Sequence, residues 1–427
     1  MSKDKKKEKD LANKKFTTNN LHLDRSAKPE HGAIHKPIHT SVAFGYEDAR
    51  DLAAVFKGTK KGYAYSRQLN PTVTALQNKI TEMEEGIATL AFSTGMAAIA
   101  ATMLSLLRTG DHLIASSFLF ANTRSFLSTL KGLGISVTLV DPTKSQNVES
   151  AITSHTVMIF VETIANPATQ IADLSGIGVL CQKHNILYCV DNTLTTPYLF
   201  LPKTVKASLV INSLTKSIGG HGNALGGTIT DTGLYDWRLF KNINKTDQNL
   251  DTSQWGITQI RKKGLRDMGA SLSAESAHHL SIGSETLSLR LERACSNAMS
   301  FALFCNDHPS ITKTFYPGLK DHPQHIRAAE LFNSFGTLVS INLDNKVDCF
   351  EVLNNMTTVI ASTNLGDNRT LGIPVAHTIF YELGSKQRKA MGIEQSMLRF
   401  AIGIENEKVL LDDLSQALAK AGDNNHD

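Results

Sequence analysis

Long apolar runs are absent from this sequence, and cysteine is scarce. No apolar stretch approaches the ~18–20 residues that a helix needs to cross a bilayer, and the N-terminus lacks the apolar core of a secretion signal. The five cysteines are scattered, odd in number and without C-x-x-C spacing, which is typical of reduced, mostly buried thiols. We therefore expect a cytoplasmic protein without a membrane partner.

A surplus of one charge sign is also missing from most of the chain. Residues 1–15 hold seven lysines against three acidic residues, and this segment alone accounts for the net charge of +4. A short lysine-rich terminus is usually a disordered, solubilising tail, although such a tail could touch nucleic acid or anionic lipid. We assign it no function and expect no nucleic-acid partner.

The length of 427 residues exceeds what one core usually supports, so two folded regions are expected. Residues 1–69 are predicted to form the lysine-rich tail and an arm with little regular patterning. A larger domain is expected over residues 70–270, and it opens with a helix that starts at Asn70-Pro71. A smaller α/β domain is expected over residues 271–427.

Short apolar runs alternate with helical patterns between residues 88 and 230. The runs that we interpret as strands are Ala88–Phe92, His112–Ala115, Ser136–Val140, Val157–Val161, Ile186–Val190, Leu209–Ile211 and Gly226–Ile229. Such alternation predicts an α/β fold with a mostly parallel sheet covered by helices on both faces. The polar residues 236–260 are predicted to leave the sheet, and a helical period over residues 272–301 predicts one long connecting helix.

Lys216 follows one of these predicted strands and precedes a glycine-rich loop, residues 219–222. Open α/β sheets bind their ligands at the carboxyl ends of strands, where this lysine is expected. Ser213 and Thr215 alternate with the leucine between them, so both hydroxyls could face a phosphate. A partly desolvated lysine can lose its proton and form a Schiff base with a carbonyl cofactor, whereas a loop lysine is otherwise a solvated surface residue.

Asp191 closes the preceding apolar run and is followed by Asn192-Thr193. A carboxylate in this position is often a helix cap or half of an ion pair. Together with Lys216, however, it matches the requirements of pyridoxal 5'-phosphate (PLP). The lysine can bond the aldehyde of this cofactor, and the aspartate can keep the pyridine nitrogen protonated.

Gly95 and Met96 lie where the run Ala88–Phe92 gives way to a helical stretch, after Ser93-Thr94. The pattern predicts a strand, a tight turn and a helix start. Free amides at a helix N-terminus bind phosphate, and glycine allows its close approach. We therefore expect the phosphate of the cofactor at this turn.

Three histidines, His31, His35 and His39, are spaced four residues apart, as on one face of a helix. Gly32 and Pro37 interrupt any such helix, so we do not expect these side chains to share a metal. No metal site is predicted in this chain.

Several short motifs, in the order in which they occur here, resemble those of a known family between Tyr65 and Glu405. They are Tyr65-Ser66-Arg67 with Asn70-Pro71-Thr72, Ser93-Thr94-Gly95-Met96, Glu162-Thr163 with Asn166-Pro167, Val190-Asp191-Asn192-Thr193 with Thr196-Pro197-Tyr198, Ser213-Leu214-Thr215-Lys216 with Gly220-His221-Gly222, Tyr316-Pro317-Gly318-Leu319, and Leu398-Arg399-Phe400 with Gly403-Ile404-Glu405. The chain is similar to the PLP enzymes of cysteine and methionine metabolism, the trans-sulfuration enzymes. The resemblance implies the fold type I architecture of PLP-dependent transferases, as in aspartate aminotransferase.

The resemblance also implies roles for particular residues. Lys216 would carry the cofactor and move protons, Asp191 would pair with the pyridine nitrogen, and Asn166 would bond the phenolic oxygen of the ring. The groups implied for the phosphate are the Gly95 and Met96 amides, the Ser213 and Thr215 hydroxyls, and Tyr65 and Arg67 of a neighbouring subunit. Arg399 would bind the substrate carboxylate as a planar fork, with Asn364 as a secondary candidate.

Phe120 departs from the family pattern, because most members have a tyrosine that stacks on the cofactor ring at this position. Phenylalanine retains the stacking and loses a hydroxyl that assists proton transfer. A thiolate leaving group depends more on such an acid than acetate or succinate does. The substitution therefore favours chemistry on an activated homoserine ester.

The leading hypothesis is γ-replacement on O-acetyl- or O-succinylhomoserine by sulfide or cysteine, which gives homocysteine or cystathionine. The alternatives are elimination, as in methionine γ-lyases and cystathionine lyases, and a PLP-binding protein without catalysis. By resemblance, the protein is expected to be a homo-oligomer, a dimer of dimers, with active sites shared between subunits and a small amino acid as substrate.

Overall fold

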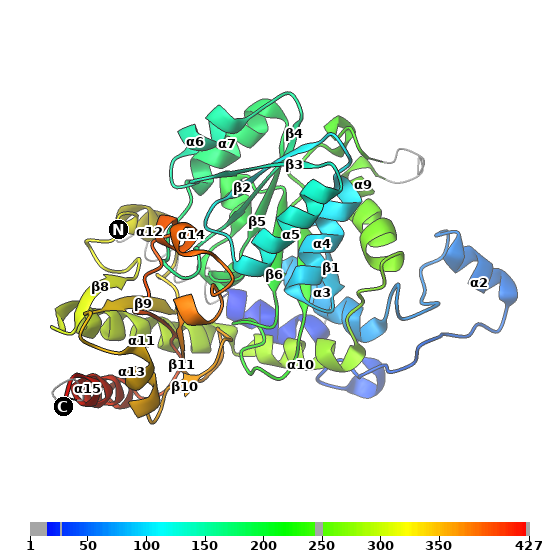
Figure 1. Ribbon diagram of the computed structural model, residues 1–427. Coiled ribbons are helices and arrows are strands. Elements are labelled where there is room, and N and C mark those ends of the chain that lie inside the picture. The colour runs from blue at the N-terminus through cyan, green and yellow to red at the C-terminus, as the bar shows by residue number, and fades with distance from the viewer. Residues whose placement is uncertain (1–14, 26–27, 244–250, 424–427) are drawn as a thin grey trace.

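The computed structural model describes residues 15–25, 28–243 and 251–423 (Figure 1). Two sheets organise these residues. The smaller sheet and the C-terminal helix α15 (Glu407–Asp423) lie to one side of the large sheet in Figure 1. The predicted tail, residues 1–14, lies outside the described residues.

The large sheet has seven strands in the order β1-β7-β6-β5-β4-β2-β3. Its strands are β1 (Ala88–Phe92), β2 (His112–Ser116), β3 (Ser136–Val140), β4 (Thr156–Glu162), β5 (Leu187–Asp191), β6 (Leu209–Ser213) and β7 (Gly227–Asp231). The neighbours from β3 to β6 pair in parallel, and β7 pairs antiparallel to both β6 and β1. All seven predicted strands are confirmed within one or two residues, as is the mostly parallel α/β sheet.

Alternate residues of β2, β4, β5 and β6 enter different cores, which shows that the central part of the sheet is buried on both faces. In β4, Met158 and Phe160 pack in one hydrophobic cluster, and Ile159 and Val161 pack in another. The helices around the sheet are α3 (Pro71–Met83), α4 (Gly95–Leu106), α5 (Ala121–Gly132), α6 (Ser145–Ala151), α7 (Leu174–His184), α8 (Thr196–Leu199) and α9 (Trp255–Gln259), with the 3₁₀ turn η2 (Pro202–Val205) and the π-helical turn η5 (Ile260–Arg266). This double cover explains why the strands form continuous apolar runs in the sequence.

The smaller sheet has five strands in the order β10-β11-β12-β9-β8. They are β8 (Ile311–Phe315), β9 (Leu338–Leu343), β10 (Ile360–Ala361), β11 (Leu371–Pro374) and β12 (Met397–Ala401), and only β10 and β11 pair in parallel. The helices of this region are α11 (Leu287–Asp307), α12 (His325–Leu331), α13 (Cys349–Asn355), α14 (Ser385–Ala390) and α15, with the 3₁₀ turn η6 (Val375–His377). Residues of α11, α13 and α15 pack with β9 and β12 in a separate core.

The single long helix predicted over residues 272–301 is wrong, because it is two helices. Helix α10 (Ala274–Glu285) ends before Thr286, whose ψ is 11°, and α11 begins at Leu287. The break has a visible cause. The Arg290 guanidinium turns back to bond the carbonyls of Gly283 and Ser217, at 2.7 and 2.6 Å. The bond to Ser217 anchors the loop that follows Lys216.

Two other sequence predictions need correction. The arm has more structure than its patternless sequence predicts, since residues 15–25 are helical and α2 (Ala49–Phe56) stands away from the body in Figure 1. The described part of residues 236–260 leaves the sheet but packs back against it, while residues 244–250 lie outside the described residues. The described part contains η3 (Trp237–Leu239) and η4 (Thr252–Gln254), and Trp237, Phe240 and Ile257 are buried in the core under the sheet.

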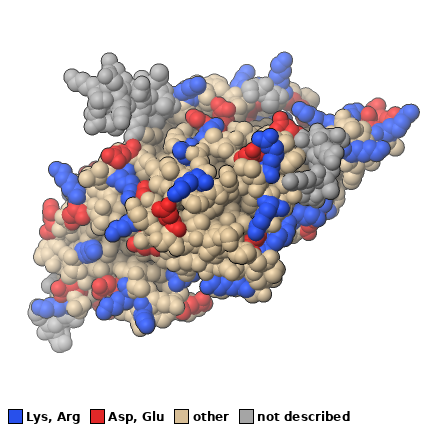
Figure 2. Space-filling model, turned by 90° about the horizontal axis from the view of Figure 1, so that it is seen from above, with Lys and Arg blue, Asp and Glu red and all other residues tan. Residues whose placement is uncertain are grey.

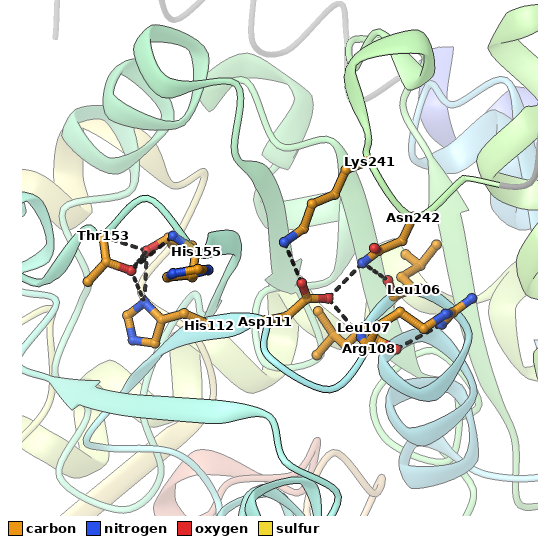
Figure 3. A network of polar contacts seen from close by, with 10 residues as sticks. Leu106, Leu107, Arg108, Asp111, His112, Thr153, His155, Lys241 and Asn242 are labelled. Carbon is orange, nitrogen blue, oxygen red and sulfur yellow. Dashed lines mark hydrogen bonds and ion pairs between the residues drawn. The ribbon is translucent and has the colours of Figure 1, made fainter.

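A polar network marks the amino end of β2, at the edge opposite to the strand ends considered below (Figure 3). The buried Asp111 carboxylate bonds the Lys241 ammonium and the Asn242 amide, both at 2.6 Å. On the face shown in Figure 2, Lys and Arg are interspersed with Asp and Glu. Among the described residues, no helix combines the length and the apolarity of a membrane span.

Candidate active site

Polar side chains gather where β4, β5 and β6 end, around a cavity of about 240 Å³. The strand register causes this, because Glu162 at the end of β4 pairs with Asp191 at the end of β5, and β6 continues the same edge. The cavity is lined by Thr94, Gly95, Met96, Ile99, Phe120, Thr123, Glu162, Ile164, Asn166, Asp191, Thr193, Leu194, Ser213, Thr215, Lys216, Leu225, Thr363, Leu365 and Arg399. Nine of the predicted site residues are among them.

Gly95 and Met96 begin α4 at the wall of the cavity, as predicted. Thr94 caps the helix through a bond from the Ala97 amide, at 2.9 Å, while the first amides of a helix have no partner within it. A Cβ on Gly95 would lie 2.8 Å from the Ser213 Cβ, so only glycine lets the helix start approach β6 this closely. The turn therefore presents backbone donors and a helix dipole to the cavity.

The two hydroxyls predicted to face a phosphate differ in their surroundings. Thr215 Oγ1 exchanges bonds with the backbone of Gly226, at 3.0 and 3.3 Å, so its hydroxyl already stabilises the loop. The Ser213 amide donates to Thr193 Oγ1 at 2.8 Å, which leaves the Ser213 hydroxyl beside Gly95. Both side chains line the cavity.

Lys216 extends into the cavity, and its Nζ donates to Asn364 Oδ1 at 2.7 Å. Burial, and to a lesser extent the charge of Arg399, lowers the pKa of Lys216 to about 8. An appreciable fraction of the amine is therefore neutral near physiological pH. A neutral amine is the form that attacks carbonyls and accepts protons.

Asp191 lies half buried beside Thr193, whose amide donates to Asp191 Oδ1 at 2.9 Å. Burial raises the pKa of Asp191, and the bonds from Thr193 oppose the shift. A buried carboxylate without a cation is costly. The arrangement thus suits a positively charged partner in the cavity.

Glu162 is a site residue whose importance the sequence reasoning missed, although it ends β4 as Asp191 ends β5. It accepts a bond from the Phe120 amide at 3.0 Å. Burial and then the neighbouring Asp191 raise the pKa of Glu162 to about 8, so it is mostly a neutral acid at pH 7. The signal was available, because a carboxylate follows the apolar run 157–161 directly.

Phe120 precedes the first residue of α5 and lines the cavity with its ring. The bond from its amide to Glu162 fixes the start of α5 over the ends of the strands.

Arg399 comes from β12 of the smaller sheet and is 1% exposed. Its Nη2 donates to the carbonyls of Thr363 and Asn364, both at 3.0 Å, and Nη1 reaches Asn166 Oδ1 at 3.4 Å. The buried Nε has no partner among the described residues. Burial lowers the pKa of Arg399 to about 10, which leaves a charged guanidinium with unused donor capacity.

Tyr65 and Arg67 are the predicted residues that this chain does not bring to its own cavity. Tyr65 is 42% exposed, and the Arg67 guanidinium lies over its ring at 5.4 Å. Arg67 Nη1 donates to the Arg266 carbonyl at 2.6 Å. Neither side chain lines the cavity.

The three histidines spaced four apart do not converge on one point. His39 bonds the Pro37 carbonyl, and His35 lies near Asp24 and Glu285, with one ligand atom of each within 4.8 Å of the others. The buried Lys79 ammonium already pairs with both carboxylates, at 3.5 and 3.3 Å. This ammonium thus compensates part of the negative charge of the two carboxylates.

Known proteins resemble the chain over almost its whole length. The model of the family described as "Cys/Met metabolism PLP-dependent enzyme" matches residues 17–419. An L-methionine gamma-lyase of Fusobacterium nucleatum subsp. polymorphum is 34% identical and covers 91% of this chain and 94% of its own length. An O-acetyl-L-homoserine sulfhydrylase of Corynebacterium glutamicum is 31% identical over 95% of this chain and 97% of its own.

The solved structures support the same relationship. The crystal structure of a putative O-acetylhomoserine (thiol)-lyase of Campylobacter jejuni, in which PLP is joined to a lysine, aligns with a TM-score of 0.90 at 29% identity. The alignment covers 95% of this chain and 99% of that one.

Proposed function

The chain belongs to the Cys/Met metabolism family of PLP-dependent enzymes, and from this premise we propose that it catalyses γ-replacement on a homoserine ester. The substrate would be O-acetyl- or O-succinyl-L-homoserine, and sulfide or cysteine would take the place of the ester. The products would be homocysteine or cystathionine, with acetate or succinate released.

The residues around the cavity fit the cofactor of the family, PLP. When bound, PLP supplies an electron sink that stabilises negative charge at the substrate Cα. Lys216 would hold it covalently. Asp191 would meet its protonated ring nitrogen, because this half-buried carboxylate has no cation as a partner among the described residues. The start of α4 would receive the phosphate, because the Gly95–Ser213 approach leaves a cradle that a Cβ would fill.

The substrate would be oriented from the smaller sheet. The unpartnered Nε of Arg399 and its weakly bonded Nη1 can grip a carboxylate as a planar fork. The Asn364 carbonyl and amide oxygen brace Arg399 and Lys216 at the same time, through bonds of 3.0 and 2.7 Å. Asn364 would therefore set the spacing between the carboxylate and the amine that moves protons.

Lys216 would act as the base at Cα, because its lowered pKa gives a neutral amine near pH 8. The surrounding side chains Ile99, Ile164 and Leu365 keep this part of the cavity apolar. An apolar surrounding keeps the amine uncharged and limits access of water, which would compete with the sulfur nucleophile.

The observation that favours replacement over elimination is Phe120. It offers an aromatic face without a hydroxyl at the wall of the cavity. A carboxylate leaving group departs without a strong acid, whereas a thiolate benefits from one. The proposal is therefore chemistry on esters rather than on thioethers.

The second candidate is γ-elimination of methionine or cystathionine to a thiol, a 2-oxo acid and ammonia. It is favoured by the similarity to the L-methionine gamma-lyase of Fusobacterium nucleatum. Glu162 adds a chemical argument, because its raised pKa keeps a protonated carboxyl at the cavity near neutral pH.

A substrate panel on purified, PLP-loaded protein tests the proposal. O-Acetyl- and O-succinyl-L-homoserine are supplied with sulfide or cysteine, and methionine and cystathionine are supplied alone. We expect homocysteine or cystathionine from an ester, and little 2-oxobutyrate from methionine. Rapid release of methanethiol from methionine would replace the proposal by the second candidate. No turnover on any of them, despite bound cofactor, would point to a non-catalytic protein.

The exposed positions of Tyr65 and Arg67 support a further part of the proposal. These residues would complete the phosphate site of a second copy of the chain, so the active unit would be at least a dimer, and a dimer of dimers by family resemblance. The domain boundaries near residues 70 and 270 also remain a proposal.

A further inference from the structure

Glu84 is a buried carboxyl group that the proposed reaction does not use. It follows the last residue of α3, is 0% exposed, and lies behind the strand ends that carry the site. One of its oxygens, Oε1, accepts bonds from the Asn192 amide at 3.0 Å and from the Asn212 amide at 2.6 Å. Asn192 follows Asp191 and Asn212 precedes Ser213, so a single oxygen joins the ends of β5 and β6.

Asn192 is itself held in place by further hydrogen bonds, which fix the orientation of its amide. Asn192 Nδ2 also donates to the Phe200 carbonyl at 3.1 Å, and its Oδ1 accepts from the Thr195 hydroxyl at 2.5 Å. Asn192 therefore points its amide at Glu84 in one orientation. The backbone of Asn192 meets β6 as well, because its N–H donates to the Ile211 carbonyl at 2.8 Å.

Two buried atoms of this bridge, Glu84 Oε2 and Asn212 Oδ1, have no hydrogen-bond partner in the part of the chain that the structure describes. Both are acceptors if Glu84 is ionised, and buried acceptors without donors are rare in folded proteins. A proton on Oε2 turns the carboxylate into a donor, and an acid and a primary amide can pair through two such bonds. One proton on Oε2, donated to Asn212 Oδ1, would thus give both atoms a hydrogen-bond partner.

No cation among the described residues bonds the Glu84 carboxyl. Glu82 and Glu85 flank it along the chain, Asp191 precedes its partner Asn192, and Lys203 contacts Glu85. Glu82 and Glu85 are exposed, and Lys203 bonds the Glu85 carbonyl instead. A charge on Glu84 would be buried without compensation, which is costly.

We propose that Glu84 is a positioning residue that, as a neutral carboxylic acid, ties the ends of β5 and β6 together and so sets Asp191 against the Lys216 segment. The link between Glu84 and catalysis rests on the function proposed above for Asp191 and Lys216. The proposal that Glu84 is protonated does not depend on that function.

The direction of the pKa shift agrees with this arrangement. Burial raises the pKa of Glu84 from 4.5 to about 7, against the two asparagine bonds, which lower it. The folded protein then retains a proton that the unfolded chain releases at about pH 4.5. The stability that depends on this proton is present below pH 4.5 and is lost as the pH rises through about 7.

The substitution Glu84→Gln tests the protonation, because glutamine imitates the neutral acid. Its oxygen can accept from both asparagines and its amide can donate to Asn212 Oδ1, but it does not ionise. Thermal unfolding midpoints of the PLP-loaded variant and the wild type are compared from pH 5 to pH 9. We expect similar midpoints at pH 5 and a lead of roughly 3–6 °C for the variant at pH 9.

Glu82→Gln is the matched control, since Glu82 lies on the same helix but is exposed. It should retain the pH dependence of the wild type. The proposal is overturned if Glu84→Gln keeps that pH dependence as well, or if it is the less stable protein at pH 5, because Glu84 would then act as an ion.

Positioning is tested by Glu84→Ala, or by Asn212→Ala if the first variant does not fold. Either change removes the bridge, and we expect a decrease in kcat of about tenfold with a smaller change in KM, together with a shifted visible band of the cofactor. Glu84→Gln should retain the wild-type band and kcat. An unchanged band and kcat in both alanine variants would refute positioning. These comparisons hold for any substrate that the enzyme turns over, so they fail or succeed separately from the proposed choice of substrate.

Discussion

The two sheets of the molecule contribute to the cavity in different ways. The large parallel sheet supplies groups from three strand ends, at Glu162, Asp191 and the Lys216 loop, because parallel strands all end at one edge. The smaller, mostly antiparallel sheet supplies Arg399 from within β12 and Asn364 from the loop after β10. On the proposed roles, the first sheet holds the cofactor and moves protons, and the second recognises the amino acid.

Lys216→Ala should have the largest effect, because it removes the covalent anchor and the base together. We expect turnover to decrease by about 10³-fold or more, while the fold persists. The measurement is steady-state turnover on a homoserine ester, with Lys183→Ala, an exposed lysine on α7, as control. Borohydride reduction should attach the cofactor to Lys216. Attachment to any other lysine would exclude the assigned role.

Arg399→Lys should separate the contributions of the two sheets, since it changes only substrate recognition by the smaller sheet. A lysine keeps the charge and loses the planar fork, so we expect KM for the amino acid to rise by about 10²-fold. The visible absorption of bound cofactor should stay as in the wild type. A loss of cofactor instead of a rise in KM would show that the division between the sheets is wrong. Arg238→Ala, at an exposed ion pair, is the control.

The pH dependence of cofactor loading examines the large sheet alone. The pKa of Lys216 is lowered to about 8, so the neutral amine becomes more abundant as the pH rises to that value. The rate at which apoprotein takes up PLP should therefore increase by about tenfold for each pH unit from 6 to 7 and level off above 8. Stopped-flow absorbance follows this uptake. An inflection near 10.5 would mean that the apoprotein does not desolvate the amine.

Arg67→Ala should leave the two sheets of its own chain unaffected. It should weaken the phosphate site of a second copy of the chain. We expect PLP to bind about tenfold more weakly, as is typical for loss of one charge-assisted contact. Mixing inactive Lys216→Ala chains with Arg67→Ala chains should restore part of the activity. If the mixture does no better than the average of its parents, the sites are not shared.

Phe120→Tyr should have the smallest effect. It tests whether a hydroxyl at the wall of the cavity promotes elimination. The added hydroxyl should raise elimination of methionine relative to ester replacement by a few-fold, well below the ~10²–10⁴ of an ideally placed acid. Product ratios by chromatography give the result. If the wild-type enzyme already cleaves methionine faster than it converts esters, the claim that Phe120 favours replacement over elimination is wrong.

The sequence predicts much of the large sheet, because strands buried on both faces form continuous apolar runs. Asp191, Ser213 and Lys216 could be placed at its edge for the same reason. Gly95 was found through turn chemistry, which is local. These inferences need only the residues of one short segment at a time.

The remainder depends on contacts between distant segments. The break at Thr286 follows from the reach of Arg290 to Ser217, which the helical period of the sequence does not reveal. The burial of Trp237 shows why the prediction of a polar excursion needed correction: tertiary packing outweighs the polar composition around this residue. The raised pKa of Glu162 arises from burial and then from Asp191 on another strand, neither of which a single segment of sequence reveals. Arg399 and Asn364 were located by family resemblance, since no local pattern distinguishes them.

The fate of one substrate tests the central claim most directly. PLP-loaded enzyme is given O-acetyl-L-homoserine with saturating sulfide, and homocysteine and 2-oxobutyrate are measured in the same reaction. Replacement gives homocysteine and acetate, whereas elimination gives 2-oxobutyrate, ammonia and acetate. We predict that homocysteine exceeds 2-oxobutyrate by about tenfold, a difference of about 1.4 kcal/mol between the two barriers. A product dominated by 2-oxobutyrate would contradict the account and identify the protein as a lyase.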